Sequence, residues 1–161
     1  MPTTLDDVDR KILRALQQNA RVSNAEIARQ LGMVPSAILE RIRKLEERGY
    51  VLGYEARLNP RLLGRSLVAF IQVKTEGREH GGVAEALSRV PEILEIHTIA
   101  GEDCYLLKVR VADIEGLRAL LSEKIAAVPA VVGTKTTVVL GTKKETGHLP
   151  VEPAALPVVS R

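Results

Sequence analysis

The sequence predicts an α+β protein with two domains, a helical domain followed by a domain of strands and helices. Three observations support this prediction: only helical periodicity before residue 50, alternating strand-like and helix-like segments after Leu67, and a change of composition near residues 59–66. We therefore expect a winged helix-turn-helix domain over residues 1–53, a linker of a strand and a loop over 54–66, a ferredoxin-like βαββαβ domain over 67–145, and a proline-rich tail over 146–161.

The first two helices are predicted from capping residues and apolar stripes. Thr4 and Asp7 resemble a capping box, and the apolar positions that follow repeat at helical spacing, which predicts a helix over residues 5–18. Ser23 and Glu26 resemble a better capping box, in which each side chain bonds the backbone N–H of the other residue. A second helix is therefore expected directly after Ser23.

The third helix follows the second after a tight turn at Gly32. It begins at Pro35, whose missing N–H suits a first helical turn, and it ends at Gly49. Three helices in this arrangement present the third to the DNA major groove. The apolar side of this helix carries Ile38, Ile42 and Leu45, and its polar side carries Ser36, Glu40, Arg43, Lys44 and Glu47. The β-prone residues 50–59 that follow either fold back as a wing or lead out as a linker strand.

The second domain repeats one pattern. Strand-like segments that begin at Leu67 and Cys104 lie 37 residues apart, and each is followed by a helical segment and a further strand. Two consecutive βαβ units of this size predict the ferredoxin-like fold. In the first strand, apolar residues lie on both faces, and two helices cover only one face of such a sheet. Since exposed apolar surface costs about 25 cal/mol per Å², we expect a second copy of the chain to cover the other face.

Composition excludes several classes of protein. No apolar run approaches the roughly 20 residues that span a bilayer, and the acidic N-terminal segment does not resemble a secretory signal, so we expect a cytoplasmic protein. One cysteine and three scattered histidines make a poor set of zinc ligands, and a nucleophilic Cys104 paired with His97 is less favoured than a small apolar cysteine beside a strand histidine. The net charge of +3 favours a local basic patch, and four aromatic residues are too few for a base-stacking binder of single strands.

Three stretches resemble the Lrp/AsnC family of transcription regulators, also known as feast/famine regulators. They are LDDVDRKILRALQQNARVSNAEIARQLG from Leu5, PSAILERIRKLEERGYVLGYEARLNP from Pro35 and GEDCYLLKVRV from Gly101, and the resemblance extends from residue 5 to about residue 144. It implies that the third helix reads operator DNA and that the second domain dimerises, builds larger oligomers and binds a small effector, commonly an amino acid. We therefore expect a nucleoid-associated regulator that forms homodimers and a tetramer of dimers, without enzymatic activity, membrane contact or a cofactor other than an effector.

The resemblance and the chemistry of the side chains together predict a DNA-binding set. Arginine and lysine side chains neutralise phosphates or reach guanine, and Ser36 and Glu40 are implied to lie near the groove. The alternative is a solvated helix face with pairs such as Glu40–Lys44. Val34 stands where the family usually has a serine or threonine cap, so we expect no side-chain cap there. A dimer would place two third helices about 34 Å apart on a roughly palindromic operator. The expected DNA contacts are Ser23, Asn24, Pro35, Ser36, Glu40, Arg41, Arg43 and Lys44.

The resemblance also implies an effector site in the turn between the second and third strands. A carboxylate or backbone amides there would meet the ammonium and carboxylate groups of an amino acid. The expected residues are Gly101, Glu102, Asp103, Cys104 and Tyr105, with hydroxyls from Thr134 and Thr136. Cys104 stands where many relatives carry an aspartate, and strand propensity alone also explains the two threonines. Two other functions stay open: a decarboxylase of siroheme or a heme precursor on the same two-domain body, and an assembly module that does not bind DNA.

Overall fold

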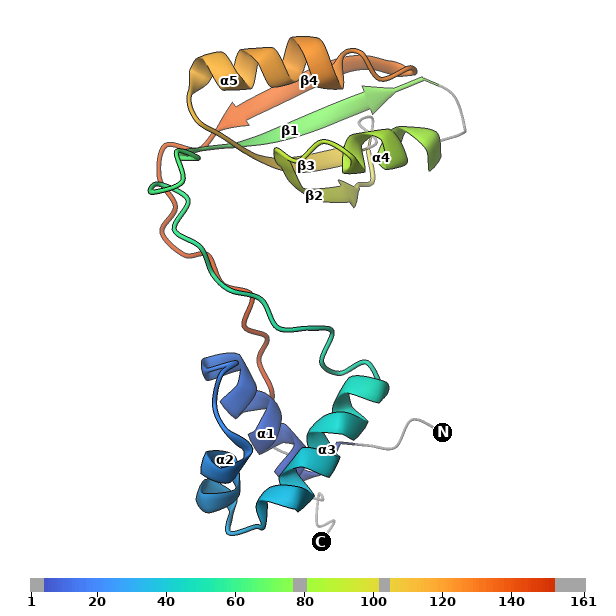
Figure 1. Cartoon of the computed structure of the whole chain (residues 1–161). Helices are drawn as coiled ribbons and strands as arrows, with labels where there is room; N and C mark the ends of the chain where they lie inside the picture. Colours follow the sequence, from blue (N-terminus) through green and yellow to red (C-terminus); the bar gives the residue numbers. More distant parts are fainter. Residues whose placement is uncertain (1–4, 77–80, 102–104, 153–161) are drawn as a thin grey trace, which may run out of the picture. The chain divides into compact units, whose positions relative to one another are not determined.

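The computed structural model describes residues 5–76, 81–101 and 105–152. The chain divides into two compact units: unit 1 comprises Met1–Arg57 and Thr146–Arg161, and unit 2 comprises Leu58–Glu145 (Figure 1). Within the described ranges, no helix combines the length and the apolar character that crossing a membrane requires.

Unit 1 contains the three predicted helices, α1 (Asp7–Gln18), α2 (Asn24–Leu31) and α3 (Pro35–Glu47). The expected cap of α1 was wrong: the helix begins after Asp6, which accepts a hydrogen bond from the Asp9 N–H and forms a capping box with Asp9. An aspartate at the N-cap also adds a favourable negative charge at the helix start. The apolar stripes of the three helices meet in one core made of Ile12, Ile27, Ala28, Ile38, Ile42 and Leu45.

The turn that precedes α3 has the predicted form. Gly32 ends α2 with φ of 65°, a left-handed conformation that glycine adopts without strain. Val34 makes no side-chain cap bond to α3, as predicted from its apolar side chain. After α3, residues 51–59 form neither a wing strand nor a linker strand. A strand needs a neighbour to pair with, and no ladder with this segment is formed in the described part of the chain.

Unit 2 contains a four-stranded antiparallel sheet with strand order β2-β3-β1-β4, which confirms the predicted ferredoxin-like topology. Helices α4 (Gly81–Ser88) and α5 (Ile114–Ala119) lie along the sheet (Figure 1). Leu87 of α4 and Leu117 of α5 belong to the same buried core as Ala69, Ile71 and Val73. The strands are β1 (Leu67–Thr75), β2 (Ile93–Thr98), β3 (Tyr105–Val111) and β4 (Val131–Val138).

The helix after β3 has a side-chain cap at its start and changes its winding further along. Asp113 caps α5 by accepting from the Gly116 N–H at 2.8 Å. From Leu120 to Ile125 the chain continues as a π-helix, which buries Leu120 and Ile125. Ile114, in the first turn of α5, is exposed. The wider π turn brings residues five positions apart onto the buried side.

The face of the sheet opposite the core carries charge as well as apolar surface. Phe70 is 37% exposed on this face, and its partner across β3 is Lys108. The carboxylate of Glu145, which follows β4, forms ion pairs with Lys108 at 2.6 Å and with Arg110 at 3.2 Å. The hydrogen bond from Lys108 lowers the pKa of Glu145. The alternation of β1 predicted an apolar second face, and the structure shows that charged side chains occupy part of this face.

The segment after Glu145 packs on unit 1. The side chain of Gln17 in α1 donates to the Leu149 carbonyl at 3.0 Å and accepts from the Leu149 N–H at 2.7 Å. Helix α1 and the extended residues 50–55 and 147–152 line a hollow of about 650 Å³. Unit 1 therefore includes the described start of the segment that the sequence analysis assigned to a separate tail.

Candidate nucleic-acid interface and effector region

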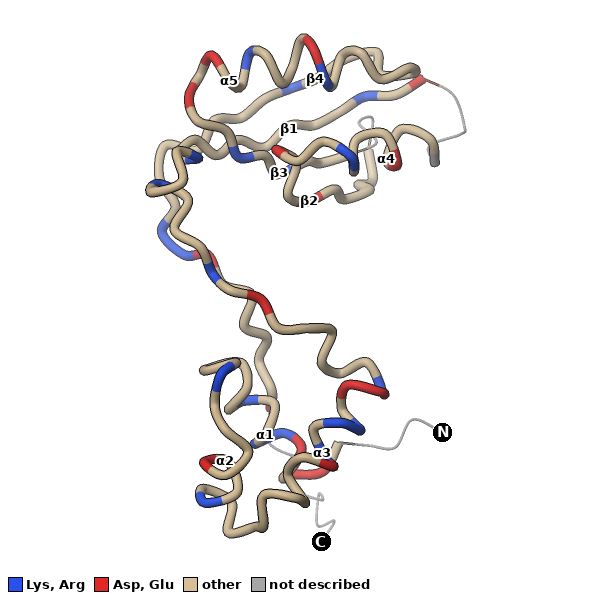
Figure 2. Tube along the Cα trace, in the orientation of Figure 1, with Lys and Arg blue, Asp and Glu red and all other residues tan. Residues whose placement is uncertain are grey.

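The outer side of α3 is exposed and carries alternating charge (Figure 2). Ser36 lies in the first turn, and the side chains of Arg43 and Lys44 are each 59% exposed further along the helix. The opposite side of α3 is held in the core by Ile38, Ile42 and Leu45, which fixes the direction in which the outer side points. The structure therefore brings together the predicted residues Ser36, Glu40, Arg43 and Lys44 on one accessible surface, here named the α3 face.

The cations of the α3 face are paired with carboxylates of the same helix. Arg43 lies 3.1 Å from Glu40 and 3.3 Å from Glu47, and Lys44 lies 3.4 Å from Glu40. The hydrogen bond from Arg43 lowers the pKa of Glu40. Exposed pairs of this kind are weak because water screens both charges, so a phosphate competes with them at small cost. The predicted Glu40–Lys44 pair is thus compatible with DNA contact.

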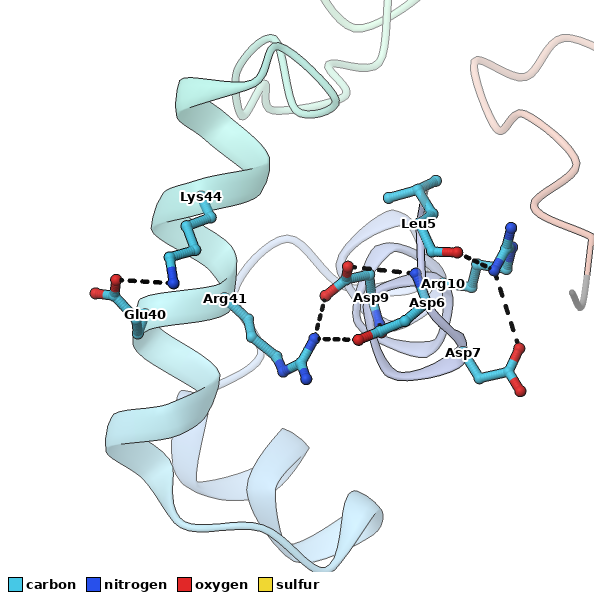
Figure 3. Close-up of polar contacts among 8 residues, drawn as sticks. All are labelled: Leu5, Asp6, Asp7, Asp9, Arg10, Glu40, Arg41 and Lys44. Atoms are coloured by element: carbon cyan, nitrogen blue, oxygen red, sulfur yellow. Dashed lines mark hydrogen bonds and ion pairs between the residues drawn. The ribbon is translucent and has the colours of Figure 1, made fainter. Parts of the chain in front are cut away.

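Arg41 has different surroundings from Arg43 and Lys44. Its guanidinium Nη1 donates to Asp6 Oδ2 at 2.6 Å and to Asp9 Oδ1 at 2.7 Å, both at the start of α1 (Figure 3). The side chain of Asp9 is only 11% exposed. These hydrogen bonds raise the pKa of Arg41. Arg41 was predicted with the phosphate contacts, whereas in the structure it joins α3 to α1.

The remaining predicted DNA contacts lie at helix starts. Ser23 caps α2 by accepting from the Glu26 N–H at 3.1 Å. The expected return bond from Glu26 is replaced, because its carboxylate instead binds Arg29 at 2.6 Å and Gln30 at 2.8 Å. Asn24 is half-buried in the first turn of α2, and Pro35 is exposed in the first turn of α3.

Leu39 is a residue of α3 that the sequence analysis did not single out. It is 57% exposed, and it lies one turn after Ser36 and one turn before Arg43. An apolar side chain in this position suits the C5-methyl group of thymine, which lies in the major groove. The signal in the sequence was a leucine outside the apolar stripe of Ile38, Ile42 and Leu45.

The predicted effector residues are only partly brought together. Tyr105, at the start of β3, is 2% exposed and its side chain belongs to the core of unit 2. The reason is the alternation of β3, in which every second residue from Tyr105 to Val111 faces the helices. Gly101 is exposed and has φ of 134°, and Glu102, Asp103 and Cys104 lie outside the described residues.

The two threonines of β4 lie on the helix-covered side of the sheet. Thr134 pairs with Val73 and Thr136 with Ile71, and both partners are fully buried. Val73 pairs in turn with Tyr105, the first residue of β3, so Thr134 and Tyr105 share one row of the sheet. Since β4 is an edge strand, Thr134 is exposed and Thr136 half-buried. This edge is the described part of the candidate effector region.

The described residues hold no group of three or more histidine, cysteine or acidic side chains that would bind a metal ion. His97 pairs with Glu95 at 3.1 Å on the exposed face of β2. The nucleophile that the sequence analysis weighed, Cys104, lies outside the described residues.

A helix-turn-helix with an exposed α3 face, joined in one chain to a ferredoxin-like sheet, defines a DNA-binding regulator of two domains. Comparison with known families agrees. A family described as winged helix-turn-helix DNA-binding matches residues 5–51, and the Lrp/AsnC ligand binding domain matches residues 68–149. The chain belongs to the Lrp/AsnC family of DNA-binding transcriptional regulators.

Individual relatives support this assignment over the decarboxylase alternative. The leucine-responsive regulatory protein of Escherichia coli is 40% identical over 149 residues, which cover 90% of each chain. The structure of E. coli AsnC has a TM-score of 0.86 at 28% identity and covers 92% of this chain and 100% of its own. The regulator NMB0573 of Neisseria meningitidis, solved as a complex with L-Met, has a TM-score of 0.87 at 32% identity and covers 91% of this chain and 97% of its own.

Proposed function

We propose that this regulator binds a roughly palindromic operator as a homodimer, with one α3 face in each of two successive major grooves. The observation that carries the proposal is the α3 face itself, where Ser36, Arg43 and Lys44 are exposed and the ion pairs are weak. The open face of the sheet, with exposed Phe70, is the surface proposed for the second copy. The protein is proposed to act in the cytoplasm at the nucleoid, without catalysing a reaction, and to build a tetramer of dimers.

We further propose that an amino acid is the effector. Two similar proteins were solved as complexes with L-methionine, the N. meningitidis regulator and a feast or famine regulatory protein of M. tuberculosis that is 33% identical to this chain. The hydroxyl of Thr134, an exposed residue on the same row of the sheet as Tyr105, is proposed to bind the ligand's polar groups. The ligand changes assembly only when it binds one arrangement of the C-terminal domains more tightly than another.

DNA binding is tested by charge removal on the α3 face. The double variant R43A/K44A should bind all duplexes more weakly and flatten the dependence of affinity on salt, because two phosphate contacts are lost. The matched control is R89A/R118A, which removes two similarly exposed, helix-paired arginines of unit 2. Selection of bound genomic fragments supplies the operator for both measurements. Equal binding by R43A/K44A and the wild-type protein would refute the assignment of the α3 face.

The effector proposal is tested by calorimetry of the wild-type protein against the twenty amino acids, followed by sedimentation with and without each binder. T134V should weaken binding because the valine lacks a hydroxyl, whereas S88A, which removes an exposed hydroxyl at the end of α4, should bind normally. Absence of heat and of any change in oligomer size with all twenty would overturn the proposal.

A further inference from the structure

The start of α1 and the middle of α3 are joined by one ionic cluster, which consists of Arg41, Asp6 and Asp9 (Figure 3). A single guanidinium nitrogen, Nη1 of Arg41, lies within 2.6 Å of Asp6 Oδ2 and 2.7 Å of Asp9 Oδ1. We name this set the Arg41 cluster. It joins the start of α1 to the middle of α3, a helix whose own start at Val34 has no side-chain cap.

The two aspartates are already committed to the first turn of α1. Asp6 Oδ1 accepts from the Asp9 N–H at 2.7 Å, and Asp9 Oδ2 accepts from the Asp6 N–H at 3.5 Å. Each carboxylate therefore uses one oxygen for the capping box and its other oxygen for Arg41. Arg10 donates to the Leu5 carbonyl, which also holds the backbone directly before Asp6 (Figure 3). Arg41 can therefore make both hydrogen bonds only when the first turn of α1 is formed.

Burial makes this arrangement specific. Asp9 is 7% exposed, and two carboxylates this close together require a cation between them. Partial burial opposes ionisation of Asp6, but the hydrogen bonds from the Asp9 N–H and from Arg41 outweigh it and lower the pKa of Asp6. The apolar packing of Ile38, Ile42 and Leu45 sets which side of α3 faces outward, and the charged, directional contact of Arg41 adds a fixed point between α3 and the start of α1.

We infer that Arg41 is a positioning residue for DNA recognition, which acts through Asp6 and Asp9 and sets the placement of α3, and is not a phosphate contact. This inference rests on the proposed function of the α3 face. Base edges are read by contacts with fixed geometry, whereas long basic side chains follow a phosphate when the helix shifts. Loss of the Arg41 cluster should therefore lower specificity for the operator more than affinity for unspecific DNA.

The test compares full-length variants on the selected operator and on an unspecific duplex over a range of salt concentrations. R41Q and D9N should each lower the ratio of operator to unspecific affinity by about tenfold, the discrimination that one base contact provides. Their salt slopes should stay at the wild-type value. The double variant R41Q/D9N should be no worse than the single variants by more than about twofold, because both changes break the same cluster.

Two controls separate positioning from charge. R43Q removes an equal charge from the α3 face and should lower the salt slope by about one while keeping most of the affinity ratio. D7N removes an equal charge from the first turn of α1, where Asp7 pairs with Arg10, and should match the wild-type protein. If circular dichroism shows that D9N loses helix, D6N takes its place. D6N keeps the contact of Arg41 with Asp9.

The outcomes are distinct. A lower salt slope for R41Q together with a wild-type affinity ratio for D9N and D6N would make Arg41 a phosphate contact and overturn the inference. Wild-type ratios for R41Q, D9N and D6N would overturn it as well while leaving the proposed function intact. Failure of the wild-type protein to bind any duplex would remove the proposed function itself.

Discussion

Arg41 and Arg43 lie two positions apart in α3 and have different surroundings. At about 100° per residue they point in nearly opposite directions, Arg43 into solvent and Arg41 toward α1. The sequence identifies both as basic residues of the third helix, and helical spacing separates them only when the position of α1 is known. Arg41 and Asp9 are 32 positions apart in the chain, so their contact is tertiary and does not follow from the spacing within either helix.

Leu39 is expected to determine specificity at one base. L39A should weaken operator binding by about 5- to 20-fold when a thymine faces it, because the contact with the C5-methyl group is lost. Replacing that thymine with deoxyuridine removes the methyl group and should weaken the wild-type protein to the same extent, with no further loss for L39A. Fluorescence anisotropy with singly substituted operators measures both effects.

Leu94 provides the control for this substitution, because it is similarly exposed, at 52%, and lies in unit 2. L94A should bind each operator like the wild-type protein. An operator series in which no deoxyuridine substitution distinguishes L39A from the wild-type protein would contradict the role of Leu39.

Asp6 is expected to contribute a pH-dependent part of the stability of unit 1. Its pKa is lowered in the folded chain, where the opposing effect of burial is outweighed by the bonds from Asp9 and Arg41. The contribution is therefore present above the unfolded-state pKa of about 4 and is lost as the pH falls below it. In urea unfolding, the free energy of unfolding should fall less between pH 7 and pH 3 for D6N than for the wild-type protein. Parallel curves for the two proteins, with D7N as the matched control, would contradict this prediction.

At the scale of elements, α3 has an uncapped start that a single substitution should improve. Val34 is 62% exposed and makes no cap bond, so its replacement removes no core contact. V34S should stabilise unit 1 by about 1 kcal/mol, because the serine oxygen can accept from an N–H of the first turn. For a domain of this size the melting temperature should rise by about 4–8 °C. The control is V132S, at an exposed valine of β4, which should not raise the melting temperature. An unchanged melting temperature for V34S would show that the N–H groups of the first turn of α3 already have hydrogen-bond partners.

Elements with a strong local signal were predictable from the sequence, and those that depend on distant contacts were not. The first strand was predicted at Leu67–Thr75 and lies there, since both of its faces are partly apolar and its length is typical of a strand. The turn at Gly32 and the start of α3 at Pro35 also follow from local chemistry. The π-helical turn after Leu120 and the bonds between Gln17 and Leu149, 132 residues apart, depend on packing that periodicity does not encode.

The candidate site divides in the same way. Exposure of Ser36, Arg43 and Lys44 follows from the helical wheel and was predicted correctly. The burial of Tyr105 was missed because the family resemblance assigned it to a turn, while the alternation of β3 places its side chain in the core. Alternation within the strand itself was therefore the signal that would have indicated this burial.

At the scale of the whole molecule, the open face of the sheet is expected to hold two copies together. Phe70 is 37% exposed at the centre of β1, with Lys108 and Thr137 as its neighbours on the adjacent strands. F70E places a carboxylate in an interface that would bury it. The dissociation constant of the dimer should therefore rise by at least about tenfold. Sedimentation velocity measures the change, and I114E, an exposed apolar residue at the start of α5, is the control that should leave assembly intact.

The same association predicts how operator spacing affects binding. Two α3 faces held by a dimer meet successive major grooves about 34 Å apart, so inserting five base pairs between the half-sites turns one of them to the opposite side of the duplex. Wild-type affinity should then fall to that of a single half-site, and an insertion of ten base pairs should restore part of it as far as the dimer can extend. F70E should bind all three operators equally and weakly, because each copy then contacts one half-site alone. A wild-type protein that is insensitive to the five-base-pair insertion would show that its two α3 faces are not held at a fixed spacing.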